Sequence, residues 1–161
     1  MGPTTEGSPA GEPERPPGGP DPDLPPEECC LETGFTSAGL PRLRVLTGAY
    51  AAHLGLAGRG REALLLSANE VADNAIRHAG GGGRLALYRD GPLVCCRVCD
   101  DGPGFDPSVV PERAPGLGSP TGWGLWTVRQ LTDGLEIGRG DGDRSRGAVV
   151  TFWVRLTRSV R

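Results

Sequence analysis

A single helix-forming segment, Arg61 to about Ala79, most constrains what this chain can fold into. Its apolar side chains recur at helical spacing and fall on one arc: Leu64, Ala68, Val71, Ala72, Ala75 and Ala79. The helix must stop at Gly80–Gly83, because four glycines are too flexible to continue it. Two strands are predicted next, Arg84–Arg89 and Leu93–Asp100, joined by the hairpin signal Asp90-Gly91. One apolar arc beside a hairpin predicts a helix packed on a sheet.

The remaining elements complete an α+β domain. They are, in chain order, a strand at Cys29–Phe35, a helix capped by Thr36 or Ser37 and reaching Leu54, a helix at Gly124–Thr132, and strands at Leu135–Gly138 and Ala148–Leu156. We therefore expect a two-layer α/β sandwich. Its mixed sheet of about five strands should carry three helices on one face.

The chain divides into one domain and two tails. Residues 1–28 are dominated by Pro, Gly and Glu, so they cannot bury enough apolar surface to offset their ordering entropy and are expected to be disordered. The domain should span residues 29–156, with residues 157–161 as a short C-terminal tail. Within the domain, Asp101–Thr121 has many Pro and Gly residues and no periodicity. A loop of that length is usually functional or disordered, and we interpret it as a lid.

Charge and hydropathy exclude some functions. The net charge is −3 and the basic residues, all of them Arg, are scattered along the chain, which argues against nucleic-acid binding as the main role. The N-terminus lacks the basic and apolar regions of a secretory signal. No apolar stretch approaches the roughly 18 residues that a membrane span requires. These features predict a cytoplasmic protein that does not enter membranes.

Five cysteines occur, an odd number that argues against a disulfide framework. Cys96 and Cys99 have the spacing of a zinc knuckle, but Cys95 adjoins Cys96 and no histidine follows at ligand spacing. The favoured interpretation is that Cys29, Cys30 and these three are small apolar residues of strands.

Two polar rows border the apolar arc of the Arg61–Ala79 helix. Each row steps by four residues, so its side chains face one small volume: Asn69, Asp73 and Arg77 in one, Glu70, Asn74 and His78 in the other. The second row sets a carboxylate, which can act as a base, beside an amide oxygen, which is a hard ligand suited to Mg²⁺. Polar helix rows are more often solvated faces, so the spacing alone leaves both interpretations open.

Two glycine-rich segments adjoin regular elements. Asp100 ends a strand and precedes Gly102 and Gly104, where the backbone can approach a ligand closely and a carboxylate can accept the amine of adenine. Gly122 and Gly124 precede a helix, whose N–H groups and dipole can hold phosphate. Taken singly, the first segment also fits an ordinary turn, and the second a flexible loop that ends at a helix.

The order of these motifs resembles one ATPase superfamily. E-x-x-x-N on a helix, then D-x-G-x-G after a strand, then G-x-G-L before a helix is similar to the pattern in gyrase B, histidine kinases, MutL and the large heat-shock chaperones, the GHKL superfamily. The resemblance covers Cys29 to Leu156. It is closest to the compact anti-sigma-factor serine/threonine kinases of the RsbW type, which have a segment similar to N-E-V-A-D-N-A-I-R-H-A.

The resemblance implies the Bergerat ATP-binding fold, with ATP and Mg²⁺ as cofactors, and a role for each matching position. It makes Glu70 the general base, Asn74 a magnesium ligand and Asp100 the residue that reads adenine. The glycine positions and one leucine complete the nucleotide site: Gly102 and Gly104 flank adenine, while Gly122, Gly124 and Leu125 meet the phosphates.

Two positions stand apart from these roles. The family often has Gly-Thr before the last strand, whereas this chain has Gly147-Ala148 and so lacks a threonine hydroxyl near adenine. His78 occupies a position where the family often has histidine, and we expect it to pack rather than to take part in catalysis.

The resemblance further implies a kinase that binds a sigma factor and phosphorylates a serine or threonine of an anti-anti-sigma protein of the STAS type, and so regulates transcription. It also implies a homodimer. The alternative is an ATP-gated protein-binding module of the same fold without significant kinase activity, in which ATP orders the lid and so changes a surface for a partner. The sequence contains the same base and magnesium ligand in either case.

Overall fold

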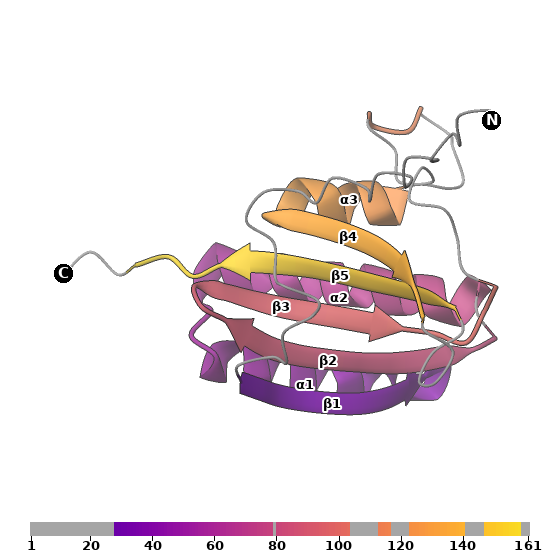
Figure 1. Ribbon diagram of the computed structural model, residues 1–161, viewed down its shortest axis with the longest axis horizontal. Helices are drawn as coiled ribbons and strands as arrows, with labels where there is room; N and C mark the ends of the chain where they lie inside the picture. The colour runs from indigo at the N-terminus through magenta and orange to yellow at the C-terminus, as the bar shows by residue number, and fades with distance from the viewer. Residues whose placement is uncertain (1–27, 79, 104–112, 117–122, 141–146, 159–161) are drawn as a thin grey trace, which may run out of the picture.

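The computed structural model describes residues 28–78, 80–103, 113–116, 123–140 and 147–158. Within them the elements follow in the order β1 (Glu28–Thr36), a 3₁₀ turn η1 (Ser37–Gly39), α1 (Leu40–His53), α2 (Gly58–His78), β2 (Gly82–Asp90), β3 (Leu93–Cys99), α3 (Trp123–Leu131), β4 (Gly134–Arg139) and β5 (Ala148–Arg155). Figure 1 shows the five strands as one twisted sheet with the helices behind it. The expected α+β sandwich is confirmed.

The sheet has the strand order β1-β2-β3-β5-β4, and all four neighbouring pairs are antiparallel. The expectation of a mixed sheet was therefore wrong. Helix α3 does connect two strands of the same direction, β3 and β4, but β5 lies between them, so they never pair. The β2–β3 hairpin forms as expected: Asp90 pairs with Leu93, and Gly91 takes the positive φ of +54° that a tight turn requires.

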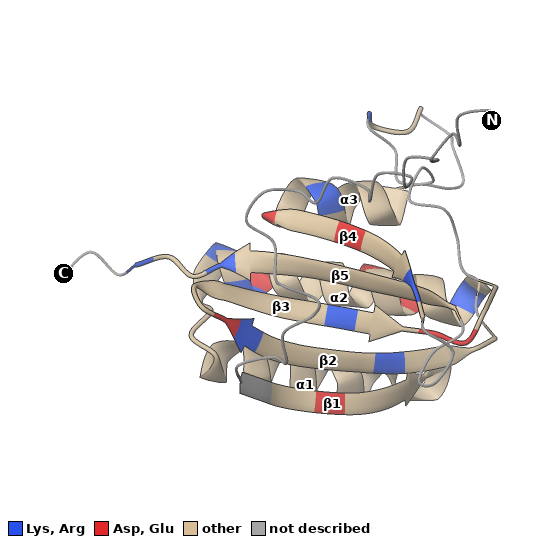
Figure 2. Ribbon diagram, in the orientation of Figure 1, with Lys and Arg blue, Asp and Glu red and all other residues tan. Residues whose placement is uncertain are grey.

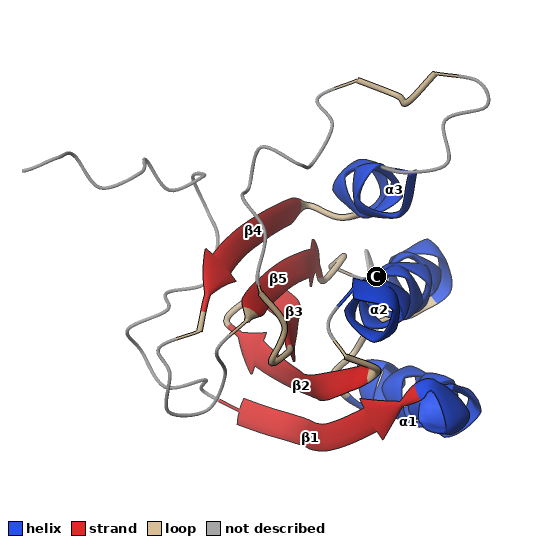
Figure 3. Ribbon diagram, turned by 90° about the vertical axis from the view of Figure 1, so that its right-hand side faces the viewer, coloured by secondary structure: helices blue, strands red, loops and turns tan. Residues whose placement is uncertain are grey.

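All three helices cover the same face of the sheet, as Figure 3 shows from the side. The predicted apolar arc of α2 forms the centre of this layer. Its described members are buried: Leu64, Ala68, Val71, Ala72 and Ala75, whereas Ala79 lies outside the described residues. They meet the inward side chains of the central strands, among them the fully buried Leu85 and Phe152. The helix is thus positioned by its own periodicity.

The first helix begins differently from the prediction. Neither Thr36 nor Ser37 caps α1, because Ser37–Gly39 form a 3₁₀ turn and α1 starts only at Leu40. Its N-cap is Gly39, which offers no side chain to the helix end. Pro41 in the first turn lacks an N–H, so one of the groups that a cap would satisfy is missing from the outset.

The opposite face of the sheet carries a smaller apolar cluster of Tyr88, Leu93, Cys95 and Trp153. Figure 2 shows charged residues of both signs spread over several elements, and no single element gathers them. None of the helices in the described part of the chain is long and apolar enough to cross a membrane. Much of the expected lid, including residues 104–112 and 117–121, lies outside the described residues, as do residues 1–27 of the expected tail.

Candidate functional site

The candidate site begins with the row of α2 that faces α3. Glu70 and Asn74 are half-buried one turn apart, and both lie beside Gly124 in the first turn of α3. A Cβ atom built on Gly124 would stand 2.8 Å from Glu70 Oε2 and 3.7 Å from Asn74 Nδ2. Only a glycine lets the α3 backbone come this close to the carboxylate without displacing it. His78, the third member of the row, is exposed, so the packing role expected for it is wrong.

Helix α3 brings its N-terminus to this row. The first N–H groups of a helix have no acceptor within the helix, and the helix dipole makes this end favourable for anions. Gly124 and Leu125 stand in the first turn, whereas Gly122 lies outside the described residues. The Leu125 side chain is buried in the core, so only its backbone could meet a ligand.

The second polar row of α2 is engaged elsewhere. Arg44 on α1 donates from Nε to Asn69 Oδ1 at 2.7 Å. Asp73 and Arg77 form an ion pair within the helix, with 3.1 Å between Oδ2 and NH2. This row therefore has partners of its own, and for it the interpretation as an ordinary surface row holds.

Asp100 directly follows β3 and is almost fully buried, with 9% of its surface exposed. Its Oδ1 accepts two backbone hydrogen bonds, from Gly102 N at 3.0 Å and from Ala148 N at 3.1 Å. The Asp100 N–H in turn donates to Ala148 O at 3.1 Å. The structure thus brings Asp100 and Gly102 together as predicted, while Gly104 lies outside the described residues.

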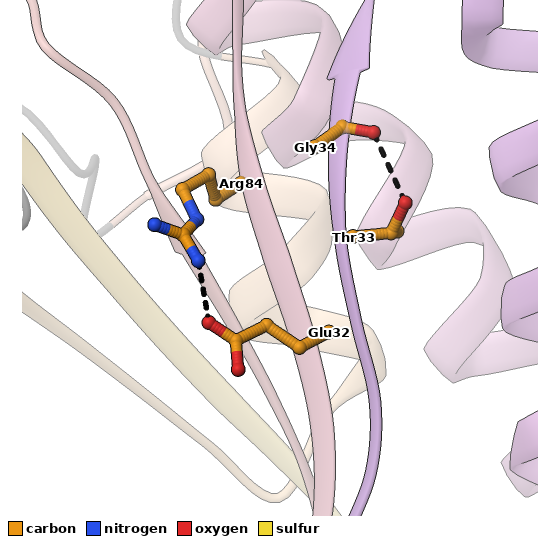
Figure 4. A network of polar contacts seen from close by, with 4 residues as sticks. All are labelled: Glu32, Thr33, Gly34 and Arg84. Carbon is orange, nitrogen blue, oxygen red and sulfur yellow. Dashed lines mark hydrogen bonds and ion pairs between the residues drawn. The ribbon is translucent and has the colours of Figure 1, made fainter.

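A pocket of about 360 Å³ opens beside Asp100, at the edge of the sheet. It is lined by the end of β1, the start of β2 and the end of β3: Thr36, Gly80, Gly81, Gly82, Gly83, Arg84, Cys99, Asp100 and Asp101. Figure 4 shows Arg84 paired with Glu32 of β1, with 2.7 Å between NH2 and Oε1. Glu70 and Asn74 do not line this pocket. The described pocket therefore belongs to the Asp100 end of the site.

The cysteines form no metal centre within the described part of the chain, where no group of three metal-binding side chains gathers. Successive residues of a strand point to opposite faces, so Cys96 lies in the helix-covered core while Cys95 lies in the cluster on the other face. Burial raises the pKa of the Cys95 thiol to about 12, and it also raises the pKa of Cys96 and of Cys99. Thiols buried in this way stay protonated at neutral pH.

The donors that hold the Asp100 carboxylate were not predictable from the sequence. The sequence shows that Ala148 lacks a hydroxyl, but its backbone N–H is one of the two donors to the carboxylate. The one available signal was a glycine, Gly147, immediately before a strand. A glycine there does not by itself indicate which residue approaches it.

Structural comparison finds solved structures of similar fold. The crystal structure of the RsbU and RsbW domains of Rv1364c from Mycobacterium tuberculosis is similar, with a TM-score of 0.57 and 20% identity over 81% of this chain and 34% of that chain. The present chain thus spans about a third of that one. The mycobacterial sensor histidine kinase MprB gives a TM-score of 0.48, with 17% identity over 78% of this chain and 97% of its own.

Sequence comparison is more decisive for the family. No curated protein matches the chain in sequence. The family model described as the histidine kinase-like ATPase domain matches residues 35–153, from the end of β1 to near the end of β5. This match includes every described residue of the candidate site. The chain therefore belongs to the histidine kinase-like ATPase domain family.

Proposed function

We propose that this domain binds Mg²⁺-ATP and transfers the γ-phosphoryl group to a serine or threonine of a partner protein. The observation that carries the proposal is the close approach of Gly124, in the first turn of α3, to Glu70 and Asn74 on α2. It sets a carboxylate, an amide and the N–H groups of a helix end around one point. Phosphoryl transfer requires such groups from a protein: a base, a metal ligand and donors to charged oxygens.

Each residue has a role in this proposal. The hydroxyl oxygen of the acceptor serine or threonine attacks the γ-phosphorus, and Glu70 takes the proton of that hydroxyl. The bond from the γ-phosphorus to the β–γ bridging oxygen breaks, and ADP leaves. Asn74 holds Mg²⁺ through its amide oxygen, a hard ligand that suits this ion. The backbone at Gly122, Gly124 and Leu125 donates to the phosphate oxygens.

Asp100 reads the base in this proposal. A carboxylate accepts hydrogen bonds only, so it selects the exocyclic amine of adenine over a carbonyl group at the same place. Gly102, and Gly104 beyond the described residues, let the backbone approach adenine. The near-complete burial of Asp100 supports the role, because hydrogen bonds are stronger where water is excluded.

The partners proposed are a sigma factor and a STAS-type anti-anti-sigma protein, the latter carrying the acceptor hydroxyl, with the domain acting as a cytoplasmic homodimer. The structural neighbour that contains RsbU and RsbW domains supports these partners, which are more specific than family membership alone implies. The test is to incubate the protein with labelled ATP and candidate antagonist proteins from the same genome. Labelled antagonist supports the kinase, whereas nucleotide binding without transfer to any candidate would favour the ATP-gated binding module.

Nucleotide binding is tested separately by calorimetry with Mg²⁺-ADP. Asp100→Asn should abolish binding, because an amide presents a donor where the base needs an acceptor. Asp73→Asn is the matched control, since this carboxylate belongs to the other polar row of α2 and pairs with Arg77. Unchanged affinity in a folded Asp100→Asn protein would mean that this segment is only a turn.

Tryptophan emission reports on the phosphate end of the site. Trp123 is 38% exposed and makes an edge-on contact with Trp126, with ring centroids 5.7 Å apart, whereas Trp153 is 3% exposed on the other face. Nucleotide should change the emission of the first two and leave that of Trp153 unaltered. A Trp123→Phe variant that responds to ATP as the original does would disconnect this residue from the site.

A further inference from the structure

Two backbone N–H groups orient the Asp100 carboxylate at its Oδ1 atom. The two donors come from different segments: Gly102 N follows the end of β3, and Ala148 N belongs to the first residue of β5, the strand that pairs with β3. Ala148 has no polar side chain, so its backbone N–H is the only hydrogen-bond donor that it can offer to the carboxylate. A carboxylate has about four acceptor positions, and these bonds define which of them face a ligand.

We propose that Gly147 is a positioning residue for adenine recognition, an inference that rests on the proposed nucleotide site. Because Gly147 has no side chain, Asp100 can take the orientation in which its carboxylate accepts a hydrogen bond from the adenine amine. A Cβ atom built on Gly147 would collide with Asp100 Oδ1 and would also stand 2.7 Å from Gly102 N and 2.8 Å from Asp100 O. Two of these three atoms belong to the backbone, and the third is held by two hydrogen bonds. No flexible group is available to move aside.

The requirement for glycine here is one of space. Gly147 is not among the glycines with positive φ, so an alanine could adopt its backbone conformation. Its N–H donates to Asp100 O at 3.1 Å, and Gly140 N donates to Gly147 O at 2.9 Å, which fixes the peptide on both sides. A methyl group added at position 147 must therefore displace the Asp100 carboxylate, because these hydrogen bonds hold the backbone of residue 147 in place.

Displacement of the Asp100 carboxylate should lower the selectivity for adenine as well as the nucleotide affinity. ADP carries an amine at C6 of the purine, where IDP carries a carbonyl, so the ratio of their affinities measures how well the Asp100 acceptor is aimed. We expect the folded wild-type protein to prefer ADP by about 10- to 100-fold, the range for leaving a buried polar group unpaired. In Gly147→Ala the preference should fall to about one, because the displaced carboxylate no longer discriminates.

The experiment is calorimetry of the full chain with Mg²⁺-ADP and Mg²⁺-IDP. Gly138→Ala is the matched control, since it lies in β4 near the same end of the sheet and a Cβ built there meets nothing within 4 Å. It should keep the wild-type ratio.

A second variant covers the case in which Gly147→Ala does not fold. Ala148→Pro removes the N–H that donates to Asp100 Oδ1 and adds no atom at position 147; proline is tolerated as the first residue of a strand. It should also lower the ADP preference. A reduced affinity for both nucleotides at an unchanged ratio would overturn the positioning role and leave the proposed nucleotide site intact. A wild-type protein that binds neither nucleotide would overturn both.

Discussion

The two polar rows of α2 have similar composition and the same spacing, yet they have different surroundings. Asn69, Asp73 and Arg77 are satisfied by Arg44 of α1 and by each other. Glu70 and Asn74 instead meet the backbone of Gly124 in α3. A carboxylate and an amide at positions i and i+4 of a helix therefore form a candidate site only where a second helix packs against them, as α3 does here. A side-chain partner makes such a row structural, whereas an approaching helix N-terminus makes it suited to a charged ligand.

Removing the carboxylate of each row should give the largest difference in the rate of phosphoryl transfer. Glu70→Ala should lower phosphoryl transfer to the antagonist by about 10²–10⁴-fold, the usual contribution of a positioned base. Nucleotide affinity should remain nearly intact, since the base contacts the attacking hydroxyl. Asp73→Ala makes the same chemical change on the other row and should leave transfer unaltered. Transfer by Glu70→Ala at the original rate would show that the two rows do not differ as proposed.

The amides give the next comparison. Asn74→Ala should weaken Mg²⁺-dependent ATP binding by about 10- to 100-fold, as expected for the loss of a ligand in a charged site. Asn69→Ala removes the same group from the other row, where it loses only the hydrogen bond from Arg44. Calorimetry with and without Mg²⁺ separates the two. Equal affinities for the two variants would remove Asn74 from the metal site.

Gly124→Ala tests the contact that distinguishes the rows. Alanine is about 1 kcal/mol more favourable than glycine inside a helix, so the melting temperature should not fall by much. The new methyl group must nevertheless displace Glu70, and transfer should fall by roughly tenfold or more. Gly60→Ala in α2 is the control, because its methyl group would meet only side-chain carbons at 3.4–3.5 Å. Full activity in Gly124→Ala would mean that the close approach has no role.

The smallest effect is expected on the surface row. Arg77→Ala breaks an ion pair in which the two side chains are 67% and 34% exposed. Exposed i, i+4 pairs contribute about 0.3–0.5 kcal/mol, so urea unfolding should show a loss of that order and unchanged nucleotide binding. A loss above about 2 kcal/mol would show that this row has a structural role that its exposure does not indicate.

The parts of the fold that depend on neighbouring residues were predictable from the sequence. The apolar arc of α2 has a period of 3.6 residues, and its described members are buried as expected. Strand positions followed from alternation and from the Asp90-Gly91 turn, and only their ends differ by one or two residues. The start of α1 was missed because Thr36 and Ser37 are good caps in isolation, whereas the chain first makes a 3₁₀ turn.

Tertiary structure decided what depends on segments far apart in the chain. The sequence named Glu70, Asn74 and Asp100 as candidates, but it did not distinguish the two rows of α2 or reveal the donors from Gly102 and Ala148. It also predicted a mixed sheet, whereas β5 lies between β3 and β4 and all neighbouring strands are antiparallel. Periodicity is local, since it follows from the geometry of successive residues. The contacts of Gly124 and Gly147 arise between residues about 50 positions apart, and only the packed chain defines them.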